Sequence, residues 1–480
     1  MNVQRASGAT ISGATISLAG NPIGIRADVS PQDAHINNGL RKLGFWCALG
    51  VVYLRYSLLH EALTEYGGSN GKLLYVFSIP ALFCLIASGG LQRFFAGGRP
   101  ALYWIGFVCW FFLCVPFSFW KGDSAHWAWT YLRTDFPMMV FLASLPMTWK
   151  ECRMVMYAIA FAGLTTVSFS RLFGTTYGGR IGLTFGTFAN PNDYACVLIL
   201  ALPFMVFMVL RPMKVLFPLR VLIQLACVLA ICYASYLVLA SGSRGAMLGL
   251  VACVAYLFFK GTGAVRIGLL LALPIGVAAL MVVLPSSVLV RLVNFNTDMG
   301  FKNDEASESA YLRKELVKAS IMDTLTHPIF GVGPGQFENY EGQFKSHSQG
   351  GYVGAHNAYT QTSADTGLPG IFLYLAGTFS AFFCLQRTWR LVSKSPTTPA
   401  AKEMATACIL ISVSYIGYCV AITFLNFAYL FFLPGFAGLI IAVSAAVKRE
   451  TGMVYTSSVD PRAERGQAFA GQRPAPVGKA

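Results

Sequence analysis

The sequence predicts an all-α, polytopic membrane protein, and three observations support this fold class. Of the 480 residues, 55% are hydrophobic and only 12% are charged, which is about half the charged share of a typical soluble domain. Apolar runs long enough to cross a membrane as helices recur along the chain. The Lys and Arg residues gather in alternate loops between these runs. We therefore expect about 12 transmembrane helices rather than a large soluble core.

The predicted spans follow the apolar runs in order. The first nine cover roughly residues 44–59, 73–90, 101–119, 131–148, 153–170, 193–210, 218–240, 245–259 and 266–284. The last three cover roughly residues 368–386, 404–424 and 426–447. The eighth run is short for a membrane span. Arg55 lies inside the first run, so it is either a buried functional charge or a sign that this span is misplaced.

The net charge of +15 indicates membrane topology, and we expect no binding of nucleic acid. If the N-terminus is cytoplasmic, 23 of the 36 Lys and Arg residues fall in cytoplasmic loops and tails. Cytoplasmic loops of membrane proteins carry such an excess of positive charge. An even number of spans returns the C-terminus to the same side.

The chain divides into two polar tails and one membrane domain. Residues 1–40 lack the apolar core of a signal peptide and, like residues 450–480, are expected to be disordered cytoplasmic tails. Residues 41–449 form the predicted membrane domain. The twelve cysteines lie in or beside apolar runs without the spacing of a zinc site, so we expect neither a disulfide nor a metal.

One large loop, at about residues 285–367, is predicted to lie on the periplasmic or outer side. A helix from Glu308 to Leu325 is expected there, because apolar residues recur three to four positions apart. The face so predicted consists of Leu312, Leu316, Ala319, Met322 and Leu325. His327-Pro328 ends this helix, and Gly331-Val-Gly-Pro-Gly335 forms a turn. A second helix begins at His356 and stops at Gly367-Leu-Pro-Gly370, where the tenth span begins.

Four segments of the chain, in order between residues 180 and 370, resemble one known family. The segments are Arg180 to Asn190-Pro191-Asn192, Ser241-Gly-Ser-Arg244-Gly245, Ser309 to Ala319 followed by His327-Pro-Ile-Phe-Gly-Val-Gly-Pro-Gly-Gln-Phe337, and His356-Asn357 followed by Gly367-x-x-Gly370. Each is weak alone, but together they are similar to the O-antigen ligase and O-antigen polymerase superfamily, which includes Wzy-type polymerases and lipid A-core ligases. The chain departs from the family at Asp365, where a glutamate is more usual, which leaves the contact made by that side chain open.

The resemblance implies a function at the membrane. It implies a GT-C-like glycosyltransferase of the bacterial inner (cytoplasmic) membrane, with its active site facing the periplasm. The donor would be an undecaprenyl-diphosphate-linked glycan, and the acceptor either lipid A-core or a growing glycan. Besides these partners the protein would contact membrane lipid and would use no cofactor. The polyprenyl tail of the donor also requires a lateral groove that is open to lipid.

Arginines are the predicted binding groups for the diphosphate. The outer loops hold only scattered carboxylates, so a metal site is not expected there. Arginine, in contrast, binds phosphate oxygens through two parallel hydrogen bonds and stays charged. Arg133 and Arg171 also lie near outer helix ends, where an arginine can simply extend to the lipid headgroups. The resemblance singles out Arg180, Arg244 and Arg313 as the diphosphate site.

His356 is the predicted catalytic base. A neutral imidazole can take the proton of an attacking hydroxyl, and a helix N-terminus with arginines nearby favours the neutral form. The alternative is a histidine that only packs or caps a helix, and His327 and His347 are weaker candidates for the base. Asp365 cannot orient His356, because nine helical residues separate them by about 13.5 Å. From the signature we expect supporting roles for Asn357, Asp365, Gly367 and Gly370.

A second class of function stays open at this point. A transporter or flippase of lipid-linked sugars would also have about twelve spans and internal charges. The chain lacks evident repeated halves, and the candidate groups gather on one side, which favours the enzyme. A purely structural membrane protein would not need so many outer arginines. Ligase and polymerase use the same donor chemistry, so the sequence does not separate them.

Overall fold

A computed structural model describes residues 36–68, 72–177, 179–293, 305–344, 353–394 and 398–451. Most of both predicted tails (residues 1–35 and 452–480) lies outside the described residues, and so does His347. Within the described part the chain is helical apart from one two-stranded hairpin, which agrees with the predicted all-α class.

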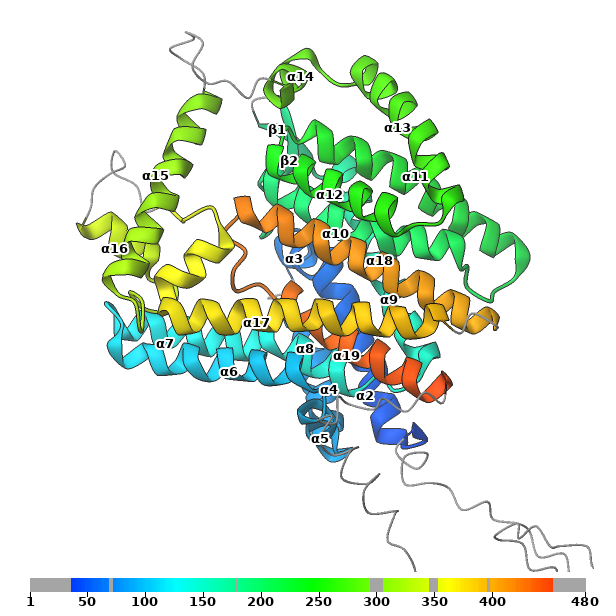
Figure 1. The fold of residues 1–480 in the computed structure, drawn as a ribbon, viewed down its shortest axis with the longest axis horizontal. Coiled ribbons are helices and arrows are strands. Elements are labelled where there is room, and N and C mark those ends of the chain that lie inside the picture. Colours follow the sequence, from blue (N-terminus) through cyan, green and yellow to red (C-terminus); the bar gives the residue numbers. More distant parts are fainter. Residues whose placement is uncertain are drawn as a thin grey trace, which may run out of the picture.

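The elements before the hairpin form the first half of the bundle (Figure 1). They are α2 (Gly39–Ser57), α3 (Leu59–Glu65), α4 (Leu73–Ala87), α5 (Gly90–Phe95), α6 (Arg99–Cys114), η1 (Val115–Phe117), α7 (Lys121–Thr130), the π-helical η2 (Tyr131–Asp135), α8 (Phe136–Ser144) and α9 (Trp149–Leu172). The hairpin that follows pairs β1 (Gly174–Tyr177) with β2 (Arg180–Leu183) in antiparallel register, Tyr177 opposite Arg180.

The elements after the hairpin complete the bundle and add a layer at one end. They are α10 (Pro191–Leu210), α11 (Phe217–Ala240), α12 (Arg244–Lys260), α13 (Gly263–Val283), α14 (Ser286–Val293), α15 (Glu305–Thr326), α16 (Phe337–Phe344), α17 (Ala358–Lys394), α18 (Pro399–Ala421), η3 (Ile422–Phe424) and α19 (Phe432–Thr451). Helix α17 packs against α6, α18 and α19, and α15 packs against the first part of α17 (Figure 1).

Eight described helices are long and apolar enough to cross a membrane, or nine if the bent pair α2 and α3 is one span. They correspond to eight of the predicted runs. The others differ for local reasons: α2 and α3 meet at 69°, α4 has 15 residues, the run 131–148 contains a π-helical turn before the nine-residue α8, and α12 has 17 residues. The total of 12 therefore remains a prediction.

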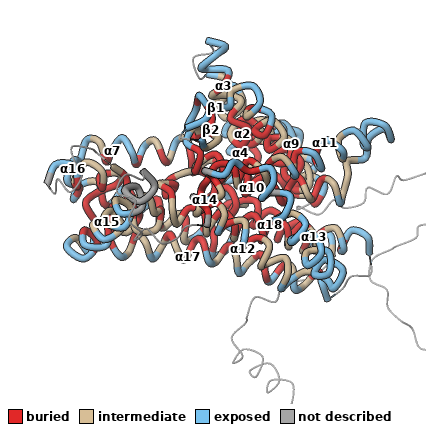
Figure 2. The backbone as a smooth tube through the Cα atoms, turned by 90° about the horizontal axis from the view of Figure 1, so that it is seen from above, coloured by how far each residue is buried: buried red, intermediate tan, exposed pale blue. Residues whose placement is uncertain are grey.

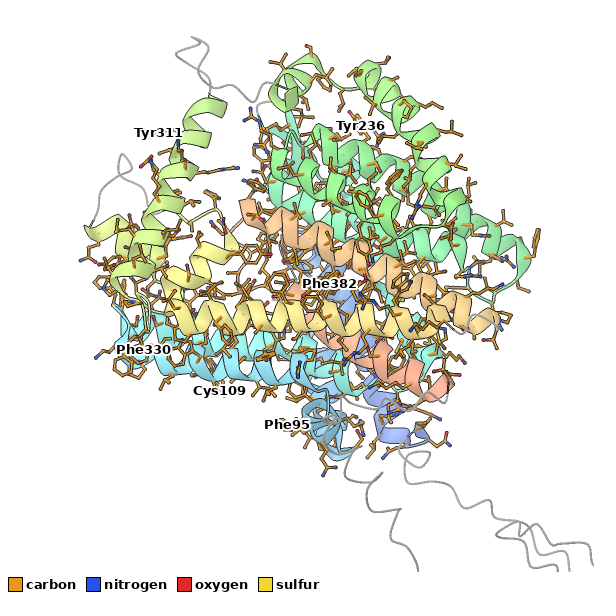
Figure 3. All side chains as sticks on the ribbon, in the orientation of Figure 1. Phe95, Cys109, Tyr236, Tyr311, Phe330 and Phe382 are labelled. Carbon is orange, nitrogen blue, oxygen red and sulfur yellow. The ribbon has the colours of Figure 1, made fainter. Side chains whose placement is uncertain are left out.

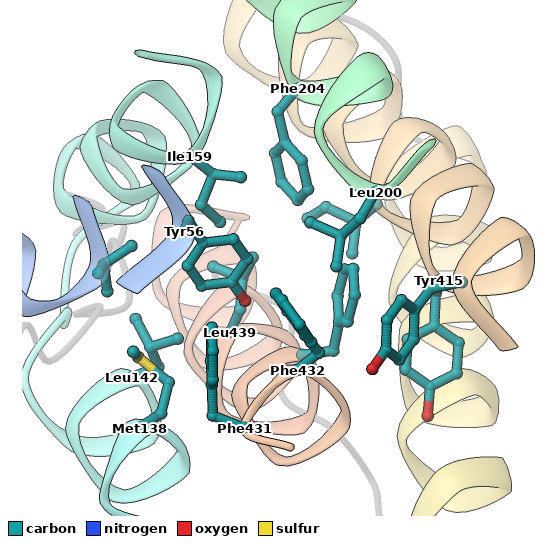
Figure 4. Close-up of a cluster of buried hydrophobic side chains, with 14 of the residues drawn as sticks. Tyr56, Met138, Leu142, Ile159, Leu200, Phe204, Tyr415, Phe431, Phe432 and Leu439 are labelled. Atoms are coloured by element: carbon teal, nitrogen blue, oxygen red, sulfur yellow. The ribbon is translucent and has the colours of Figure 1, made fainter. Parts of the chain in front are cut away.

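The buried core lies along α10, α18 and α19, while α11 and α13 are the least buried of the eight candidate spans. Figure 2 shows α13 as mostly exposed. Aromatic rings fill the centre: Tyr56 meets Phe431 and Phe432 edge to face, with ring centroids 5.2 and 5.4 Å apart (Figure 4). In contrast, the apolar window of α13 has no buried residue, and Val282 is 86% exposed. Exposed apolar side chains on such a helix are suited to contact with lipid.

One end of the bundle, which we call the basic end, carries Arg41, Arg93, Arg153, Arg211 and Arg449. Of these, Arg41, Arg93 and Arg449 donate to carbonyls at helix ends. Buried Arg41 donates to the carbonyl of Leu145 and forms a 2.8 Å ion pair with Glu151, which also closes the capping box that begins α9. The opposite end, which we call the site end, contains the hairpin, the start of α10 and the layer formed by α15, α16 and the start of α17. Helix α10 separates the two ends by about 30 Å.

The predicted apolar face of α15 is only partly correct. Helix α15 spans the predicted residues and ends at His327-Pro328, and Leu316 and Ala319 pack against Phe337, Ala355 and Ala364. Met322 and Leu325, however, are 54% and 65% exposed. Near its C-terminus the helix instead buries Ser320, Asp323 and Thr324. The reason is the polar partner surface: Thr324 shares a 2.8 Å hydrogen bond with Ser363 of α17.

Candidate active site

The sequence predicts that the helix begins at His356, but α17 begins two residues later, at Ala358, and the backbone of His356 is not helical. Its φ angle is 49°, in the left-handed region that few residues other than glycine adopt. The backbone N–H of His356 donates to the side-chain oxygen of Asn426, in the segment between η3 and α19. Asn357 then caps the helix, because its side-chain oxygen accepts from the backbone N–H groups of Tyr359 and Thr360 at 3.0 and 3.2 Å. The start of α17 therefore fixes the position of the imidazole.

The polar first part of α17 ends at Gly367, as predicted. Gly367 is non-helical within α17, with φ 70° and ψ −173°. A side chain there would collide with the backbone carbonyls of Pro328 and Ile329, so the close approach requires glycine. The amide of Leu368 donates to the Pro328 carbonyl at 2.8 Å. Gly370 has a similar role, since a side chain there would collide with Thr366 and crowd Trp110.

The glycine turn 331–335 packs on the polar part of α17. The amides of Val332 and Gly333 donate to the carbonyls of Ala364 and Asp365 at 2.8 and 3.0 Å. Phe330 stacks on Phe117 with ring centroids 3.9 Å apart, at the site end (Figure 3). The turn thereby joins the large loop to the membrane bundle.

Asp365 is fully buried, and its carboxylate stabilises the packing of these segments. One carboxylate oxygen accepts from the amide of Phe337, at 2.9 Å, and the other accepts from the hydroxyl of Tyr429, at 2.7 Å. These partners join α17 to the start of α16 and to the segment before α19. Asp365, where the family more often has glutamate, therefore accepts hydrogen bonds with both of its carboxylate oxygens.

Arg180 begins β2 and points to two neighbouring elements. Its Nε donates to the carbonyl of Ser241 at 2.6 Å, and a terminal nitrogen donates to the side-chain oxygen of Asn192 at 2.7 Å. Asn192 is in the first turn of α10, which begins with Asn190 as N-cap and Pro191 at the first helical position. Both of these acceptors are neutral, so these two bonds orient the guanidinium without cancelling its charge.

Arg244 is the first residue of α12, as the sequence predicts. Ser243 caps the helix by accepting from the amide of Ala246 at 3.3 Å, and Gly242 turns the chain with φ 60°. Gly245 allows the ring of Phe424 to approach, since a side chain at this glycine would lie 2.7 Å from it. Because Arg180 is bonded to Ser241 of the same turn, Arg180 and Arg244 belong to one corner of the molecule.

Arg313 is half-buried on α15, and its positive charge acts on His356 and on the carboxyl group of Asp193. Burial, with Arg313 as the second cause, lowers the pKa of His356 to about 4. The imidazole is therefore neutral at neutral pH. The charges of Arg313 and Arg180 both act on the carboxyl group of Asp193. Arg313 therefore lies near both His356 and Asp193, and Arg180 lies near Asp193 as well.

Three polar residues of this region escaped the sequence analysis. Asp193 directly follows the Asn-Pro-Asn segment, so its position was a usable signal. Asn426 and Glu338 meet around Gly354, where a side chain would collide with both. Burial raises the pKa of Glu338. Neither residue lies in a quoted motif. The folded chain brings Asn426 to His356, and Glu338 to Gly354 two residues before it.

The structure also describes the other arginines considered from the sequence, Arg55, Arg133 and Arg171. Arg55 lies in the last turn of α2, where it forms a 2.6 Å ion pair with Asp135 and lies 4.3 Å from the centre of the Phe431 ring. Arg133 and Arg171 are exposed, and Arg171 lies over the ring of Tyr233. Among the described residues, no group of three or more His, Cys, Asp or Glu side chains is arranged to hold a metal ion.

Comparison with known proteins places these features in one family. A search of curated proteins finds no match. A model of the O-antigen ligase family (Wzy_C) matches residues 225–375. The matched segment contains Arg244, Arg313 and the whole His356–Gly370 signature, while Arg180 lies outside it. The resemblance predicted from the sequence is confirmed over residues 225–375: this segment of the multi-pass membrane protein, less than half of the chain, matches the O-antigen ligase family.

Proposed function

We propose that the protein is a membrane glycosyltransferase. It moves a glycan from an undecaprenyl-diphosphate carrier to an acceptor hydroxyl on the periplasmic side of the inner membrane, without a metal ion. One arrangement supports the proposal: Arg180 donates to the carbonyl of Ser241, in the turn that leads to Arg244 at the start of α12, and the charge of Arg313 reaches His356. A neutral base and a group of permanent cations therefore share one end of the bundle.

The chemistry follows from these two kinds of group. The acceptor oxygen attacks the anomeric carbon of the donor, and His356 takes the hydroxyl proton. The bond between the anomeric carbon and the diphosphate oxygen breaks, and the leaving diphosphate keeps the electron pair. Arg180, Arg244 and Arg313 bind that diphosphate and stabilise its growing negative charge. The imidazolium then returns its proton to solvent, and the enzyme is ready for another cycle.

The lowered pKa of His356 suits a general base, which must be neutral before it can accept a proton. With a pKa of about 4 the free imidazole is almost entirely neutral, so it can accept a proton as soon as substrate binds. An anionic diphosphate beside Arg313 offsets the charge that disfavours imidazolium. Donor binding should thus raise the pKa of His356 and make it a stronger base in the complex. The same arginine would hold the donor and adjust the base.

Reconstituted transfer tests the proposal. Purified protein in liposomes would receive an undecaprenyl-diphosphate-linked repeat unit, with and without lipid A-core, and released undecaprenyl diphosphate would be measured. A ligase releases it only when lipid A-core is present, whereas a polymerase releases it while the glycan lengthens. Movement of intact donor across the bilayer without release would instead identify a flippase and end the proposal.

Adding a chelator to the same assay distinguishes a mechanism that uses arginines from one that uses a metal ion. Because arginines carry the charge of the leaving group, EDTA should leave the transfer rate unchanged. Loss of activity with EDTA and recovery with magnesium would show that a metal ion takes this role, and the arginine mechanism would then be wrong.

A further inference from the structure

A basic pocket lies at the opposite end of the bundle from His356. It has a volume of about 340 Å³ and is formed where the N-terminal part of α9 meets the turn between α10 and α11. Its charged lining residues are Arg153, Arg211, Lys214, Arg220 and Glu403. Four cations against one carboxylate favour a ligand with negative charge.

An apolar groove adjoins this pocket. It has a volume of about 610 Å³ and runs between α2 and α9. Its lining is almost entirely apolar and includes Trp46, Leu49 and Phe161. Tyr157 and Met213 line both the groove and the basic pocket, so the two spaces meet. A single ligand with a charged head and an apolar tail can therefore occupy both.

Most of the positive charge in the pocket is not neutralised by the protein. Arg153 forms a 3.2 Å ion pair with Glu403. Across the described chain, Arg211, Lys214 and Arg220 have no ion pair, and the Nε of Arg211 is buried without a hydrogen-bond partner. A buried donor without an acceptor destabilises the folded protein, so an acceptor atom is expected at this place.

The surroundings indicate that the ligand comes from the bilayer. Leu216 and Phe217, directly after the basic turn, are 78% and 76% exposed. Exposed apolar residues beside basic ones are typical of the boundary between headgroups and acyl chains. The groove also opens beside Trp46, which is itself exposed and belongs to α2, part of the bent pair α2 and α3 that is long and apolar enough to cross a membrane.

We propose that this pair of cavities binds one anionic phospholipid. The headgroup phosphate lies among Arg211, Lys214 and Arg220, and one acyl chain fills the groove between α2 and α9. Basic pockets between helices on the cytoplasmic side bind such headgroups in other membrane proteins. This lipid would join α2, α9 and the turn between α10 and α11, and it would stabilise the end of the bundle that takes no part in transfer. The inference is independent of the proposed function.

Lipid titration of the purified, delipidated full-length protein tests the site. Phosphatidylglycerol and phosphatidylcholine with identical acyl chains would be added in detergent, and bound lipid counted by native mass spectrometry. One phosphatidylglycerol should be retained per protein, at least tenfold more tightly than phosphatidylcholine. Each cation near a headgroup contributes about a fivefold change, so R211Q/K214Q/R220Q should weaken retention about a hundredfold.

Two further variants separate the headgroup pocket from the groove. Lys150→Gln removes an exposed cation from the same end of α9, outside the pocket, and should retain lipid like the original protein. Ala158→Leu narrows the groove and should weaken binding of long-chain lipid while short-chain phosphatidylglycerol still binds. The melting temperature without lipid shows whether each variant is folded.

Three results would overturn the inference. Equal retention of phosphatidylcholine would exclude recognition of the anionic headgroup. Unchanged retention by the folded triple variant would exclude these cations. Full competition by inorganic phosphate, together with no effect of Ala158→Leu, would show an anion site that holds no acyl chain.

Discussion

The two ends of the helix bundle both gather arginines, but they use them differently. At the basic end, Arg41 is bonded to Glu151 and Arg153 to Glu403, so carboxylates cancel much of their charge. Arg93 and Arg449 donate to the carbonyls of Ser144 and Met147, at helix ends. These contacts hold helices together.

At the site end the arginine charge acts on groups that titrate. Arg180 is held by a carbonyl and an amide oxygen, and Arg313 acts on His356 and Asp193. The comparison teaches that an arginine's partners, more than its burial, indicate its role. The contacts of Arg41, Arg93, Arg153 and Arg449 join helices, whereas the charges of Arg180 and Arg313 act on titratable groups of the candidate site. The following variants test this distinction.

The largest effect is expected from Arg313→Ala. An arginine that stabilises the charge of a departing phosphate group contributes about 10³–10⁵-fold in rate, so transfer should almost disappear. Arg313→Lys should restore only part, because a point charge replaces the planar fork. The matched control is Lys314→Ala, which removes the exposed neighbouring cation of α15. Equal loss in both variants, measured as release of undecaprenyl diphosphate, would mean that the overall charge of α15 matters and Arg313 has no special role.

His356→Ala should lower turnover by about 10²–10⁴-fold, which is the usual contribution of a positioned general base. Binding of the donor should be nearly unchanged, since the arginines hold it. His327→Ala, in the same loop layer, should retain most activity. If purified His356→Ala protein transfers glycan at the normal rate, His356 only packs and the proposed mechanism fails, although the family assignment stands.

Gly367→Ala should act on stability. The left-handed backbone and the nearby carbonyls of Pro328 and Ile329 leave no space for a methyl group, and such strain costs about 1–3 kcal/mol. A lowered melting temperature of the purified protein would report it. Gly268→Ala is the control, because nothing lies within 4 Å of that position on α13. Identical melting temperatures for the two variants would contradict the close packing of the glycine turn.

The smallest effect concerns pH. Because the pKa of His356 is lowered to about 4, the base is present above that value and is lost as the pH falls through it. Between pH 7.5 and 5.5, kcat/KM should change less than about twofold, whereas an ordinary histidine with a pKa of about 6.5 would lose about tenfold. Arg313→Lys keeps the charge and should keep this profile. A decline centred near pH 6.5 would show that His356 is not shielded as described.

Local signals predicted much of this architecture. The helix start at Arg244 and the break at Gly367 were predicted, because capping residues and glycines act over a few positions. The helix expected from His356 begins two residues later, at Ala358. The span count was less predictable. Breaks such as the bend at Leu58 and the π-helical turn before α8 depend on tertiary packing, which a hydropathy pattern does not contain.

The parts of the site that escaped prediction involve distant residues. The hairpin that carries Arg180 is short and has little alternation, and Asn426 meets His356 across 70 positions. The exposed Met322 and Leu325 show the same limit. Their spacing predicts that they face an apolar partner, but the neighbouring helix α17 presents the polar Ser363 to this part of α15. The predicted lateral groove for the donor stays a prediction, and the apolar groove described here begins at the basic end.

Photo-crosslinking of the donor carrier tests the central claim most directly, because it compares the two ends in one experiment. A polyprenyl diphosphate with a photoreactive group beside the diphosphate would be irradiated with purified protein in excess phosphatidylglycerol, and the adducts located by mass spectrometry. We expect adducts in residues 180–193, 241–247, 305–326 and 353–366, and their loss when unlabelled undecaprenyl diphosphate competes. Adducts confined to the turn around Arg211 would place the carrier at the basic end and contradict the account.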